Sequence, residues 1–160
     1  MSGLGGHGPR SIRRLLEDTD QLILEQAHAT RIFPATTDLT CTLTAHASAD
    51  TWGSWAEVQD SGGAKLSDLN GSQVLHISSV MIEWCSATDK LYHIELAYGD
   101  SYFLVAPLRF TSGALNFSSP IQQMRIRAFG VPIGEKIYYR MMSETGGGTC
   151  KVSFRYHYHN

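Results

Sequence analysis

The segment LTCTLTAH, Leu39–His46, decides the fold, because apolar and polar side chains alternate along it without a break. Side chains of a β-strand point alternately to opposite faces, so this period of two predicts a strand with one buried and one exposed face. The last segment, TCKVSFRYHYH at Thr149–His159, repeats the pattern. Its expected inward face carries Cys150, Val152, Phe154, Tyr156 and Tyr158.

Further segments with strand character lie between and before these two. They are Leu22–Ile32, Trp55–Gln59, Val74–Cys85, Leu91–Tyr98, Tyr102–Phe110 and Lys136–Ser143. Tight turns at Gly99-Asp100 and at Gly146–Gly148 separate neighbouring segments, which indicates antiparallel pairing. The serine-rich stretch Thr111–Gln123, which contains Pro120, breaks the alternation and is expected to be a loop that crosses between sheets.

We therefore predict an all-β fold, an antiparallel jelly-roll β-sandwich of about eight strands. Eight strands favour a jelly roll over the seven-stranded immunoglobulin sandwich, whose Cys-Trp-Cys signature is also missing. The sandwich is expected to span residues 21–160. Residues 1–20 begin with a glycine-rich stretch and are expected to form a flexible, extended N-terminal arm.

Composition narrows the function classes. The 160-residue chain has a formal net charge of -2, with no basic excess or polybasic block, so neither a nucleic-acid partner nor a membrane partner is expected. It has no apolar run long enough for a transmembrane helix and no secretory leader pattern. The cysteines Cys41, Cys85 and Cys150 are odd in number and form no CxxC pair, so we expect reduced, packed thiols in a cytoplasmic protein.

Histidines are the residues that first suggest a metal site. His157 and His159 lie two apart on one strand face, and His46, His76 and His93 also lie on expected strands. A cupin-type site needs the paired histidines inside the barrel with a carboxylate soon after, whereas the inward face here carries tyrosines. Surface or interface histidines are expected, with no metal and no cofactor.

The sequence also lacks a recognisable catalytic motif. Gly3–Gly8 fits the dinucleotide pattern G-x-G-x-x-G by its letters, but no strand precedes it and no helix follows in the required context. We expect no enzymatic activity. Glu95 shares a strand face with His93, which indicates a solvated face with a cross-strand ion pair.

Two tryptophans bracket a short turn, Trp52-Gly53-Ser54-Trp55. Paired indoles on the rim of a sandwich can stack on sugars, as in lectin-like modules. The alternative is that one tryptophan plugs the open end of the sandwich. We favour the plug, because no cluster of Asp and Asn nearby marks a sugar or calcium site.

Several segments together resemble a known family. They are Thr51–Val58, Tyr92–Gly99 continuing to Leu108–Phe110, Val131–Arg140 and Val152–His159. They are similar to the small jelly-roll head decoration, or cement, proteins of tailed bacteriophages and to related virion structural proteins. The resemblance implies homotrimers at threefold positions on the capsid exterior, with the N-terminal arm reaching over the major capsid protein, and synthesis in the host cytoplasm.

The resemblance therefore implies a viral capsid decoration protein that bridges capsid subunits. The expected capsid-binding arm contains Arg10, Ile12, Arg13, Arg14, Leu15 and Leu16. The expected subunit interface contains Arg109, Arg140, Arg155, His157 and His159. The alternatives are a carbohydrate- or receptor-binding jelly roll of a phage tail or fibre that uses Trp52 and Trp55, and a cupin-like metalloenzyme that uses His157 and His159.

Overall fold

The computed structural model describes residues 30–113 and 117–159, without the side chains of residues 117–122 and 159. Within these ranges the protein consists of β-strands and one short 3-10 helix, η1. The strands are β1 (Arg31–Phe33), β2 (Cys41–Thr44), β3 (Ala56–Glu57), β4 (Val74–Cys85), β5 (Leu91–Tyr98), β6 (Phe103–Thr111), β7 (Phe117–Arg125), β8 (Ile137–Ser143) and β9 (Thr149–His159); η1 is Leu66–Asn70.

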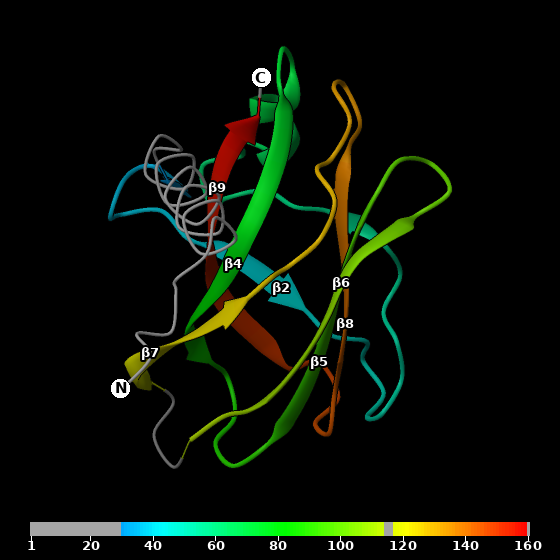
Figure 1. The fold of residues 1–160 in the computed structure, drawn as a ribbon. Helices are drawn as coiled ribbons and strands as arrows, with labels where there is room; N and C mark the ends of the chain where they lie inside the picture. Colours follow the sequence, from blue (N-terminus) through cyan, green and yellow to red (C-terminus); the bar gives the residue numbers. More distant parts are fainter. Residues whose placement is uncertain (1–29, 114–116, 160) are drawn as a thin grey trace, which may run out of the picture.

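The strands form two antiparallel sheets that pack face to face (Figure 1). The first sheet has the order β1-β9-β4-β7, with β2 also paired to β9, and the second has the order β3-β8-β5-β6. From β6 onward the chain changes sheet at every strand, and this interleaved order is that of a jelly roll. The predicted all-β antiparallel sandwich is confirmed.

Two short strands share one edge of β9. Arg31 of β1 lies opposite Tyr156, and Cys41 of β2 lies opposite Val152. The segment between them begins with the cis peptide bond Phe33–Pro34. In the structure, the strand expected at Leu39–His46 is shorter and spans Cys41–Thr44. Of the expected strand Leu22–Ile32, residues 22–29 lie outside the described residues.

The prediction of a crossing loop at Thr111–Gln123 is wrong for the second half of that segment. Residues Phe117–Arg125 form β7, which pairs with β4 at the end of the first sheet. Proline is tolerated on an edge strand, where its missing N–H need not serve a second neighbour. Pro120 also falls at an irregularity in the register, between the pairs Gln122–Ile82 and Phe117–Trp84.

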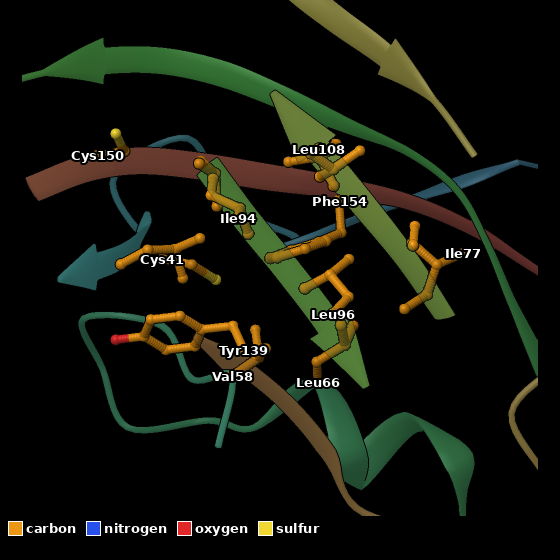
Figure 2. Close-up of a cluster of buried hydrophobic side chains, with 14 of the residues drawn as sticks. Cys41, Val58, Leu66, Ile77, Ile94, Leu96, Leu108, Tyr139, Cys150 and Phe154 are labelled. Atoms are coloured by element: carbon orange, nitrogen blue, oxygen red, sulfur yellow. The ribbon is translucent and has the colours of Figure 1, made fainter. Parts of the chain in front are cut away.

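The core lies between the sheets and consists of alternate residues from each strand. Figure 2 shows Ile94 and Leu96 of β5 and Phe154 of β9 pointing into this space. In β9, Cys150, Val152, Phe154 and Tyr156 are buried, as the period of two predicts, while Tyr158 is half-buried. Burial of one face of every long strand is the main stabilising contribution to such a sandwich.

The three cysteines are packed into this core. Cys85 and Cys150 lie directly opposite each other on β4 and β9, with their sulfur atoms 3.6 Å apart, and neither forms a disulfide. Burial raises the pKa of Cys41 to about 12, with a contribution from the nearby carboxylates Asp60 and Glu83. The hydrogen bond with Cys85, together with burial, raises the pKa of Cys150.

We expect these buried thiols to resist modification in the folded protein. Near neutral pH, Ellman's reagent should label fewer than one thiol per chain in native buffer and all three in guanidinium chloride, because only the exposed thiolate reacts rapidly. Rapid stoichiometric labelling of the native protein would show that the β4–β9 pair opens readily.

Candidate functional site

The outward face of the second sheet gathers charged and aromatic side chains. The register across β8, β5 and β6 forms two cross-strand rows, Met142–His93–Arg109 and Arg140–Glu95–Pro107. The flanking residues on the same strands, such as Ile94, Leu108 and Met141, are buried, so both rows point away from the core.

Glu95 and Arg140 form an ion pair on this face. They are directly opposite on β5 and β8, and Nε of Arg140 donates to Oε2 of Glu95 at 2.6 Å. The cross-strand ion pair expected for Glu95 is confirmed. Arg140, which was predicted to lie in the subunit interface, therefore finds a carboxylate partner within its own chain.

Arg140 also joins the two tryptophans. Its guanidinium carbon lies 4.8 Å from the ring centroid of Trp52 and 4.7 Å from that of Trp55. The backbone explains this arrangement: the N–H of Gly53 donates to the carbonyl of Met141, and Ala56 pairs with Tyr139. The turn thus runs beside β8 with Arg140 between its two points of attachment.

Further aromatic rings pack against the two tryptophans. Trp55 lies parallel to Tyr102, with ring centroids 5.0 Å apart, and Tyr102 meets Tyr138 edge-on at 5.2 Å. His93 contacts Trp52 edge-on at 6.1 Å.

The expected plug of the open end is wrong, because both indoles are half-buried over the outward face of the second sheet. Trp55 is already packed against a guanidinium and a phenol ring, so the two indoles do not form an open, paired sugar platform.

A pocket of about 290 Å³ opens beside Trp52. Its lining residues are Trp52, His93, Ile94, Glu95, Pro107, Leu108 and Arg109. Arg109 is exposed, and no ion pair or hydrogen bond joins its side chain to another of the residues that the structure describes. The pocket therefore combines an aromatic wall, a carboxylate and an available guanidinium.

A second, larger hollow of about 640 Å³ is mostly apolar. We call it the apolar groove; it is lined by Tyr98, Phe103, Leu104, Val105, Arg127, Ala128 and Phe129. Phe129 is 95% exposed, Phe103 59% and Leu104 53%. This surface was not predicted from the sequence, because Phe103 and Leu104 belong to an expected strand and Phe129 lies outside any alternating pattern.

The structure does not gather the predicted site residues on one surface. Arg109 and Arg140 lie on the outward face of the second sheet, whereas Arg155 and His157 alternate with buried residues on the first. His157 stacks on His76, with ring centroids 5.3 Å apart. His159 of β9 lies opposite Val74 of β4. The predicted arm residues Arg10, Ile12, Arg13, Arg14, Leu15 and Leu16 lie outside the described residues.

Neither a metal-binding cluster nor a membrane-spanning helix occurs in the described part of the chain. Within it, no group of three or more His, Cys, Asp or Glu side chains is arranged to hold a metal ion. Nor does any described helix have the length and apolarity needed to cross a membrane.

Comparisons with known proteins assign no family. No family model matches the chain, and no curated protein matches it. Among solved structures, the chain is similar to a family two carbohydrate esterase from Cellvibrio japonicus, with 10% sequence identity and a TM-score of 0.31. The alignment covers 82% of this chain and 34% of the esterase chain, so this chain spans about a third of that structure.

The contacts of Arg140 predict a measurable contribution to stability. Arg140→Gln should lower the free energy of unfolding by about 1–3 kcal/mol, because it removes two cation–π contacts and leaves Glu95 without its partner. Urea denaturation followed by circular dichroism measures this change. Arg109→Gln is the matched control, an exposed arginine on the same face, and should change stability by less than about 0.5 kcal/mol. Equal effects of the two variants would contradict the structural role of Arg140.

Proposed function

We propose that this chain is a non-enzymatic virion structural protein, a jelly-roll decoration (cement) protein that binds the outside of a bacteriophage head as a homotrimer. In this role it stabilises the head by bridging neighbouring capsid subunits. Two considerations support the proposal: the resemblance of its strand segments to that family, and the jelly-roll architecture, which viral capsid proteins share with lectins and cupins.

The apolar groove is the structural observation that carries the self-association in this proposal. Monomeric proteins rarely expose large contiguous apolar patches unless an interaction covers them. Here Phe129, Phe103 and Leu104 are each more than half exposed and line one groove. Covering these side chains by a second copy of the chain would remove them from water and stabilise association.

In a cyclic trimer, the apolar groove of one subunit would contact a different surface of the next subunit. Rings form through heterologous contacts, in which one surface of a subunit meets a different surface of the next. We place the apolar groove on one side of this contact, because its exposed apolar side chains are the ones that association would remove from water. Of the predicted interface residues, Arg109 and Arg140 lie on the outward face of the second sheet, and Arg155 and His157 lie on that of the first. Arg155 and His157 on the first sheet remain candidates for the receiving surface.

Attachment to the head is assigned to the N-terminal arm. Three arms on one trimer make the second and third contacts intramolecular, so weak individual binding becomes tight overall. The arm sequence supplies Ile12, Leu15 and Leu16 for apolar contact and Arg10, Arg13 and Arg14 for acidic surfaces. The partner in this proposal is the major capsid protein.

The trimer can be tested by native mass spectrometry. The wild-type protein should give a trimer, and Phe129→Ser should shift it toward monomer, because the substitution removes the most exposed aromatic side chain of the groove. Ile32→Ser is the matched control, since Ile32 is also exposed, at 45%, but does not line the groove. A monomeric wild type, or equal dissociation of both variants, would contradict this interface.

The role of the arm can be tested by truncation. Deleting residues 1–20 should leave the β-strand signal in circular dichroism and the trimeric state unchanged, because the described strands begin at Arg31. The truncated protein should no longer co-sediment with undecorated phage heads, whereas the full chain should. Equal co-sedimentation would move the capsid-binding surface onto the sandwich itself.

A further inference from the structure

We propose that the pocket beside Trp52 binds an acidic sugar, that is, a pyranose that carries a carboxylate. Such sugars include uronic and sialic acids. The inference goes beyond the proposed function, because it requires neither a trimer nor attachment to a capsid. It depends on the complementary chemistry of three walls of one pocket: an indole, a carboxylate paired with Arg140, and a guanidinium that has no partner among the described residues.

The aromatic wall suits the C–H face of a sugar ring. Trp52 and Pro107 both line the pocket, and they offer rigid apolar surfaces. Trp52 is held in place before any ligand arrives, because Arg140 packs on its ring at 4.8 Å and the His93 ring forms a T-shaped pair with it. A fixed indole loses little conformational freedom on binding, which favours affinity.

Glu95 supplies an acceptor for sugar hydroxyl groups. Its Oε2 atom accepts the hydrogen bond from Arg140, and a carboxylate has further acceptor capacity on both oxygens. The ion pair also holds the carboxylate group in a defined position at the pocket. The fixed carboxylate can therefore accept hydrogen bonds from those hydroxyl groups of a stacked pyranose that point toward it.

Arg109 selects for a negative charge. It lies opposite His93 across β5 and β6, at the side of the pocket, and has no partner among the described residues. With Glu95 neutralised by Arg140, the guanidinium of Arg109 leaves the site with a net positive charge. Arginine binds carboxylates through two parallel hydrogen bonds, which gives both strength and geometry. A neutral sugar would not satisfy this group.

The test uses D-glucuronic acid, D-glucose and acetate as probes of the full-length protein. Saturation-transfer NMR and tryptophan fluorescence titration should show binding of glucuronic acid in the millimolar range, with glucose and acetate at least about tenfold weaker, since each of these satisfies only part of the site. Equal binding of glucose would refute selection for a charge. Equal binding of acetate would refute recognition of the sugar ring, and no binding of glucuronic acid would overturn the proposal.

Variants locate the binding in the pocket. Arg109→Gln and Trp52→Ala should each weaken glucuronic acid binding by about tenfold or more. Trp84→Ala is the matched control, because Trp84 is also half-buried and packed on a cation, Lys151, but lies on the other sheet. It should leave binding unchanged. Arg109 is exposed, so its variant tests the site even if Trp52→Ala does not fold, and an unchanged affinity for Arg109→Gln would overturn the proposal.

Discussion

The pairing of β4 with β9 is the constraint on which the rest of the molecule depends. The two strands run together from Val74–His159 to Cys85–Cys150, and every other strand of the first sheet attaches to one of them. The paired strands β4 and β9 can be followed in Figure 1. Their inward side chains form one wall of the core. Because the pairing joins distant parts of the chain, such as the contact between Cys85 and Cys150 at a separation of 65 residues, the fold is expected to form slowly.

The second sheet depends on that wall and in turn builds the pocket. Ile94 and Leu96 of β5 and Met141 of β8 are buried against the first sheet, which fixes the faces of both strands. Their alternate residues, Glu95 and Arg140, must then face outward at matching positions. A slip of β8 by one residue would turn Arg140 inward and separate it from both indoles, so the outer arrangement is a direct consequence of the core register.

Local pattern was enough to predict much of this fold. The segments Val74–Cys85, Leu91–Tyr98 and Thr149–His159 have the predicted bounds, and alternation alone placed Glu95 on a face where a cross-strand partner was expected. The strand β7 was missed because Pro120 and the serines obscure its period, and an edge strand tolerates both. The packing of Trp52 and Trp55 was not predictable, since it depends on which β8 residue lies beside Gly53.

The two arginines of the outer face show how register assigns different roles to similar residues. In sequence, both adjoin an aromatic residue on an alternating strand, and both were predicted to lie in the subunit interface. In the sheet, Arg140 faces Glu95 and contacts both indoles, whereas Arg109 faces His93 and has no side-chain partner in the part of the chain that the structure describes. An arginine that orders an aromatic wall beside another that stays unpaired is an arrangement suited to binding, because the first reduces the entropy lost by the pocket and the second provides charge for a ligand.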